Sequence, residues 1–160
     1  MKNIGMIEKL KNQSTWRLAG FSIITYGVYF AYYISTQTKE INALVEGEDA
    51  ISSGFISSLF VMSYSSLFLF IAYMFVDEGS LVDGSLIEGL SGLVDMIVSI
   101  MMIIWGFKAR NRVNAYCDLE GEGDVWFHGF WTFLFSPMYF NYKVNCIYED
   151  RVEQADSEGL

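Results

Sequence analysis

Four hydrophobic runs separated by charged segments set the pattern of this chain, and the run at residues 52–76 contains neither a charge nor a proline. Because an α-helix rises about 1.5 Å per residue, a helix over this run reaches about 38 Å, more than the roughly 30 Å of hydrocarbon in a bilayer. A soluble fold of 160 residues has no core wide enough to surround such a helix on every side. We therefore predict a transmembrane helix over residues 52–76.

A second apolar run covers residues 86–107 and follows an acidic turn that has no lysine or arginine. Glu88 and Asp95 interrupt this run, and a basic cluster of Lys108, Arg110 and Arg112 follows it. The run is long enough to cross a bilayer. Together the two central runs predict a transmembrane helical hairpin.

The two outer runs, residues 16–35 and 125–142, are rich in aromatic residues, and each contains a helix breaker. Gly27 lowers helix stability by up to about 1 kcal/mol, and Pro137 removes a backbone donor. We expect two broken helical segments, re-entrant or interfacial, on either side of the hairpin. Both breakers are followed by x-Tyr-Phe-x-Tyr, which indicates two copies of one unit unless the likeness arises by chance between aromatic-rich segments.

The polar segments complete the expected organisation. Residues 36–51 have apolar positions at helical spacing, which predicts a short amphipathic helix at the surface. Residues 149–160 are polar and acidic, and we expect a mobile tail there. Residues 1–148 then form a single membrane domain.

Lysines and arginines indicate the orientation, because loops rich in them stay on the cytoplasmic side of a membrane. If all four runs cross, six of the ten basic residues lie on one side and four on the other. If only residues 52–76 and 86–107 cross, all ten lie on one side. We favour this second arrangement, an all-α membrane protein with both termini in the cytoplasm; the alternative has four transmembrane helices.

Composition excludes several classes of function. The formal charge of −9 argues against binding of nucleic acid or of anionic lipid through a basic patch. Cys117 and Cys146 have no metal-ligand spacing, and no phosphate loop, nucleophile motif or paired histidines occur in the sequence. We expect no metal, no cofactor, no small-molecule substrate and no enzymatic activity.

Two short motifs carry a family resemblance. Trp16 is followed by Thr25-Tyr-Gly27-Val-Tyr29, and the late part of the chain contains Tyr139-x-x-Tyr142-Lys-Val-Asn145. These motifs resemble those of the domain of unknown function 4234 family of small bacterial membrane proteins, over residues 14–42 and 131–148. Pro137 stands where the resemblance leads us to expect glycine. The resemblance implies a bacterial inner membrane location and no catalytic residue.

The second central run contains a polar stripe at helical spacing: Glu88, Gly92, Asp95 and Ser99. A charged carboxylate near mid-membrane costs at least about 2.5 kcal/mol, so Asp95 requires an explanation. One hypothesis is an ion- or proton-handling site in a channel or transporter component. The other is an Asp95 hydrogen-bonded to a serine or tyrosine across the hairpin or a subunit boundary.

Small residues on the two central runs allow helices to approach closely. They are Gly54, Ser57, Ser58 and Ser65 on the first run, and Ser85 and Gly89 on the second. Packing within the hairpin explains them, and an oligomer interface is the sharper hypothesis. The leading functional hypothesis is a non-enzymatic membrane protein that acts by association, as a homo-oligomer or as an accessory subunit of a larger membrane assembly. Its expected partners are lipid and other membrane proteins.

Overall fold

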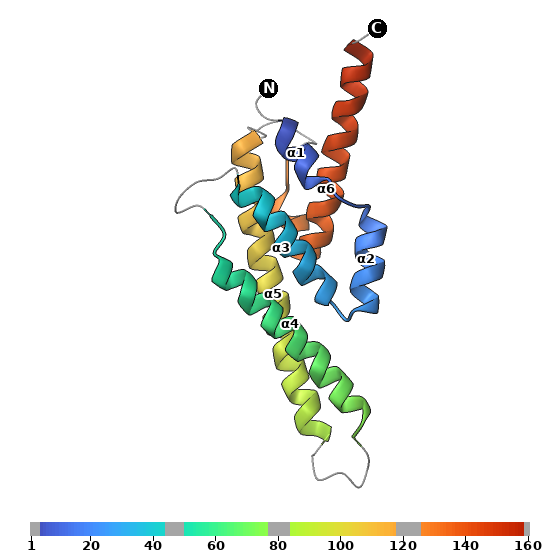
Figure 1. The fold of residues 1–160 in the computed structure, drawn as a ribbon, viewed down its shortest axis with the longest axis vertical. Coiled ribbons are helices and arrows are strands. Elements are labelled where there is room, and N and C mark those ends of the chain that lie inside the picture. Colours follow the sequence, from blue (N-terminus) through green and yellow to red (C-terminus); the bar gives the residue numbers. More distant parts are fainter. Residues whose placement is uncertain (1–3, 44–49, 77–83, 118–125, 159–160) are drawn as a thin grey trace.

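The computed structural model describes residues 4–43, 50–76, 84–117 and 126–158, and within these ranges every regular element is a helix. The helices follow one another without any intervening strand in the described residues (Figure 1). They are α1 (Ile4–Leu10), α2 (Thr15–Ile24), α3 (Val28–Asn42), α4 (Ser53–Met74), α5 (Gly84–Cys117) and α6 (Gly129–Glu158).

Helices α4 and α5 form an antiparallel hairpin whose lower half extends beyond every other helix (Figure 1). Both are long and apolar enough to cross a membrane. By contrast, α2 and α3 have 10 and 15 residues, which correspond to about 15 and 23 Å. Within the described residues, only the two central runs thus give helices of spanning length and composition.

Helix α5 continues past Phe107, where we expected the span to end, and the basic cluster lies within the helix. The continuation is stabilised by packing, because Ala109, Val113 and Cys117 recur at intervals of four and are all buried. The basic cluster therefore does not end the helix.

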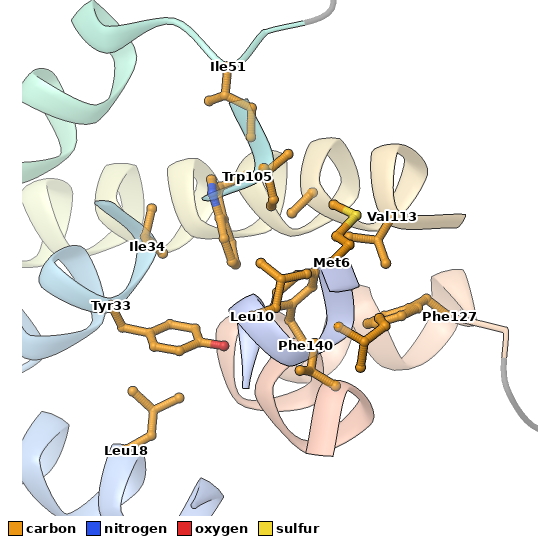
Figure 2. Close-up of a cluster of buried hydrophobic side chains, with 14 of the residues drawn as sticks. Met6, Leu10, Leu18, Tyr33, Ile34, Ile51, Trp105, Val113, Phe127 and Phe140 are labelled. Atoms are coloured by element: carbon orange, nitrogen blue, oxygen red, sulfur yellow. The ribbon is translucent and has the colours of Figure 1, made fainter. Parts of the chain in front are cut away.

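The hydrophobic core lies at the end of the molecule opposite the tip of the hairpin. Trp105 of α5 is fully buried there, with ring centroids 6.3 Å from Tyr33 and 5.2 Å from Phe140 (Figure 2). Its indole N–H donates to the Thr38 hydroxyl at 2.9 Å. The start of α1 and the end of α6 lie at this same end of the molecule (Figure 1).

The chain turns sharply between α2 and α3. Tyr26 and Gly27 have φ values of 49° and 84°, in the left-handed region that glycine adopts without strain. Helix α2 packs against α3 and α6, and after the turn α3 runs back to the core (Figure 1). The structure thus has the break expected at Gly27.

A second sharp bend divides α6 at Ser136, whose φ and ψ are 31° and −105°, directly before Pro137. Residues on either side of the bend lie next to each other: the Phe127 ring is 5.4 Å from that of Phe140, and the His128 N–H donates to the Tyr139 hydroxyl at 3.1 Å. Such contacts require the chain to double back. Residues 129–135 and 137–158 therefore form two helical arms.

One other expectation for the polar segments needs correction, and the structure adds a helix to a second. Residues 36–42 continue α3 and do not start a separate surface helix, because Gln37, Thr38 and Ile41 are buried against the core. Residues 44–49 of that segment lie outside the described residues. The segment expected to be a mobile tail is helical up to Glu158, since α6 continues through it, and residues 159–160 again lie outside the described residues.

Candidate functional site: a cavity at Asp95

Asp95 lies about midway along the apolar part of α5, where three segments of the chain meet. The Ser66 hydroxyl of α4 donates to Asp95 Oδ1. The Tyr26 hydroxyl, from the turn between α2 and α3, lies 3.5 Å from Asp95 Oδ2. The carboxylate is therefore shared between the hairpin and the first broken segment.

The conformation of the α2–α3 turn brings Tyr26 to this position. With the positive φ values at Tyr26 and Gly27, α2 ends and the tyrosine side chain points toward the hairpin. Its ring stacks on Phe70 of α4, with centroids 4.3 Å apart and planes within 15°. A continuous helix over residues 16–35 would not produce this contact, so the break places one of the polar groups around Asp95.

Beside Asp95 lies a cavity of about 600 Å³ between α2, α3, α4, α5 and Met138 of α6. Most of its wall is apolar. The hydroxyls of Ser22 and Ser63 are buried in this wall, and neither has a hydrogen-bond partner. Since nearly all buried polar groups in proteins have a partner, two unpartnered hydroxyls beside one carboxylate suggest a site built for a ligand.

The charges around the cavity are one-sided. Asp95 is the single carboxylate among the residues that line it, and no lysine or arginine lines it. Within the described residues, no three His, Cys, Asp or Glu side chains come together. The arrangement has one carboxylate and several hydroxyls in apolar surroundings, which suits a single positive charge.

The structure separates the members of the predicted stripe. Asp95 and Ser99 both line the cavity, and the Ser99 hydroxyl donates to the Asp95 backbone carbonyl at 2.8 Å. Glu88 and Gly92 are exposed and do not line it. The four residues therefore do not form one helix–helix seam within this chain.

The small residues predicted to pack the hairpin are mostly exposed and not packed between the two helices. Gly54, Ser57, Ser58, Ser85 and Gly89 are exposed, and Ser65 is half-buried with its hydroxyl bonded to the Val61 carbonyl of its own helix. The small residues of α4 that are buried are Ser63 and Ser66. We missed these two because α4 is apolar on all sides, so its sequence gives no inward face.

The fold and the site define a class: an all-helical protein with two helices that are long and apolar enough to cross a membrane. A more particular assignment comes from the family model described as domain of unknown function (DUF4234), which matches residues 13–115. Because the match covers more than half of the chain, the protein belongs to this family. The matched range contains α2, α3, α4 and all but the last two residues of α5, together with Tyr26, Ser66 and Asp95, whereas the late tyrosine motif at residues 139–145 lies outside it. Comparisons with curated proteins and with solved structures gave no match.

Proposed function

We propose that this chain is an integral membrane protein with two spans, α4 and α5, that binds a cation at Asp95 as part of an ion- or proton-handling path. The observation that carries the proposal is the Asp95 cavity: a carboxylate midway along the apolar part of α5, with two unpartnered hydroxyls buried in the wall of the same cavity. Isolated ionisable groups in membrane spans are rare and most often functional. The proposal involves no enzymatic step.

The exposed side chains of the hairpin support insertion into a membrane. From Ser66 to the C-cap of α4 at Phe75 no further side chain is buried, and Phe68, Met74 and Phe75 are exposed. Helix α5 likewise exposes Leu86, Leu93 and other large apolar residues before Trp105. Exposed apolar side chains along two adjacent helices are unfavourable in water and favourable in hydrocarbon.

The distribution of charge supports an orientation. Residues 52–107 contain no lysine or arginine, so all ten lie before or after these residues. We place the core and both termini on the cytoplasmic side of the bacterial inner membrane. The α2–α3 pair and the two arms of α6 then enter and leave by this one side as re-entrant hairpins.

Flux through reconstituted vesicles tests the function. Proteoliposomes that contain a pH-sensitive dye are given a proton gradient, and proteoliposomes that contain a Na⁺-sensitive dye are given a Na⁺ gradient. The rate of ion entry is compared with that of protein-free vesicles. We expect Asp95→Asn to abolish the added flux and Glu88→Gln to retain it, because Glu88 lies on the same helix outside the cavity. Equal flux in Asp95→Asn, or no flux in the parent protein, would refute the proposal.

Cysteine labelling from outside intact cells tests the orientation, in a background with Cys117 and Cys146 replaced. A probe at position 80 should be labelled by an impermeant reagent. Probes at positions 40, 115 and 155 should not be labelled. Labelling at 40 or 115 would favour four spans instead.

Association with a second membrane protein is the other candidate function. One observation favours it: Ser85, Gly89 and Gly92 are exposed on α5, and no atom lies within 4 Å of a Cβ placed on either glycine. Such a face lets another helix approach closely, from a second copy or from a larger assembly. The mass in mild detergent tests this: Gly89→Leu should dissociate the assembly and Gly20→Leu on α2 should not. A parent protein that is a lone monomer without a co-purifying protein would count against association.

A further inference from the structure

We propose that the Asp95 cavity binds an organic cation with a primary ammonium group and an apolar body, which enters from the bilayer. This inference rests on the proposed function and names the class of ligand. The cavity volume, the apolar walls, the two free hydroxyls and the position of the opening each contribute to it.

The volume of the cavity does not suit a bare metal ion. About 600 Å³ is roughly twenty times the 30 Å³ that a water molecule occupies in the liquid. Hard cations such as Ca²⁺ require six to eight oxygen ligands at about 2.3–2.6 Å, gathered around one point. Volumes between about 300 and 1,000 Å³ are typical of sites for small organic molecules.

The walls of the cavity suit an apolar body. Ile23, Phe30, Val98, Met102 and Met138 line most of it. Methionine side chains adapt to irregular shapes, which favours ligands with a ring or an alkyl chain. An ion surrounded by water molecules would leave these walls wet at a cost in free energy.

The polar groups suit an ammonium group. Asp95 supplies the negative charge, and the Ser22 and Ser63 hydroxyls supply acceptors that no residue of the protein uses. A primary ammonium has three N–H donors, so a nitrogen that bonds the carboxylate still has two donors for hydroxyls of the wall. A quaternary ammonium has no donor and would leave the hydroxyls unpartnered.

The opening of the cavity lies beside the α2–α3 turn. Two wall residues, Ile23 and Tyr26, are 80% and 37% exposed. They belong to the side of the molecule that faces lipid in the proposed placement. A ligand with an apolar body therefore has access through the bilayer without opening of the core.

Calorimetric titration of the protein in zwitterionic lipid nanodiscs tests the inference, with 2-naphthylethylammonium as the probe. Its neutral alcohol, its trimethylammonium analogue and Na⁺ are the comparison ligands. We expect one saturable site for the primary amine, and at least tenfold weaker binding of the alcohol and of the trimethyl analogue. Asp95→Asn should weaken the amine at least tenfold and Glu88→Gln should not, while Ser22→Ala and Ser63→Ala should each weaken it several-fold.

A cavity-filling variant keeps the test decisive even if Asp95→Asn misfolds. Ala19 lines the cavity, whereas its neighbour Gly20 is exposed with open space around it. Ala19→Phe should abolish amine binding with the carboxylate intact, and Gly20→Phe should leave binding unchanged. Equal amine binding by Ala19→Phe and the parent would overturn the inference.

The other outcomes separate the two proposals. If Na⁺ or protons bind in an Asp95-dependent way and the amine does not, the organic-cation inference is wrong and the proposed function stands. If no cation binds the parent protein, both are wrong. Amine binding that is equal in Asp95→Asn and the parent would also overturn the inference.

Discussion

Gly106 of α5 provides the sharpest test of how the second broken segment packs on the hairpin. A Cβ placed on Gly106 would lie 2.6 Å from the Ser136 hydroxyl and 3.2 Å from Thr132 Cγ2. The Ser136 hydroxyl also donates to the Met102 carbonyl. Gly106→Ala therefore forces either a shift of the bend in α6 or rotation of Ser136 with loss of this bond.

The magnitude follows from two opposing contributions to the free energy of unfolding. Overpacking at a tight contact costs about 1–3 kcal/mol, and loss of a buried hydrogen bond costs about 1 kcal/mol. Replacing glycine by alanine inside a helix regains up to about 1 kcal/mol. Gly92→Ala on the same helix gives only the gain from replacing glycine in a helix, because no atom lies within 4 Å of its Cβ position. We expect Gly106→Ala to be about 1–3 kcal/mol less stable than Gly92→Ala.

Thermal unfolding in mild detergent, followed by tryptophan fluorescence, measures this difference. At about 2–4 °C per kcal/mol for a chain of this size, the two variants should differ in Tm by about 2–12 °C. Ser136→Gly removes the hydroxyl and should largely restore the stability of Gly106→Ala in the double variant. If Gly106→Ala is as stable as Gly92→Ala, the second segment does not pack on α5 as the structure has it.

Three further predictions concern the stability of the fold, each measured as the same Tm. Gly27→Ala should destabilise the protein by about 1–2 kcal/mol because the φ of Gly27 is 84°, although the space around it is open. Gly20→Ala should not destabilise the protein, and equal Tm values for the two variants would contradict a left-handed turn. Trp105→Phe should destabilise the protein more than Thr38→Val, because both variants lose the hydrogen bond between these residues and only Trp105→Phe leaves a cavity. The reverse order would argue against this core. Tyr33→Phe should raise the Tm because the buried Tyr33 hydroxyl has no partner, and a lower Tm would show that it has one.

The sequence predicts the long helices well because their signal is one-dimensional. The helix over residues 52–76 is predicted without any information on what packs against it, because a charge-free run of this length gives the bounds of α4 almost to the residue. Gly27 likewise marks its own break, because a left-handed turn favours glycine wherever it occurs. Such features depend on local chemistry alone.

Facing directions could not be predicted, since they depend on what packs against each helix. Ser63, Ser65 and Ser66 are equivalent in an apolar sequence, yet only Ser63 and Ser66 are buried. Tyr26 lies in an aromatic-rich run whose sequence gives no direction for its side chain, whereas a positive φ at this non-glycine residue directs it to Asp95. The prediction identified the carboxylate and the residue types that bond it, a serine or a tyrosine, but it did not identify Ser66 and Tyr26 themselves.

The charged ends of α5 and α6 show that charge alone does not predict where a helix ends. Residues 108–117 and 149–158 were interpreted by their charge, which marks solvent exposure and does not end a helix. Their sequences contain no proline and no glycine, so helical hydrogen bonding continues through them. Charge indicated where a membrane could end, and the absence of helix breakers indicated where the helix continues.

A re-entrant arrangement depends on how the two breaks satisfy their backbone groups, because an unpaired amide in hydrocarbon costs several kcal/mol. At the first break, Thr25 bridges both helices: its hydroxyl donates to the Phe21 carbonyl at 2.8 Å and accepts from the Tyr29 N–H at 3.0 Å. The Gly27 N–H bonds the Ser22 carbonyl at 2.7 Å.

At the second break, Ser136 is buried against α5 and bonds a carbonyl of that helix. The first break is thus satisfied from within its own segment, and the second uses the hairpin. The first break can therefore move relative to α5 without losing its internal bonds. Since that break carries Tyr26 and one wall of the Asp95 cavity, it is the part of the site most able to adapt to a ligand.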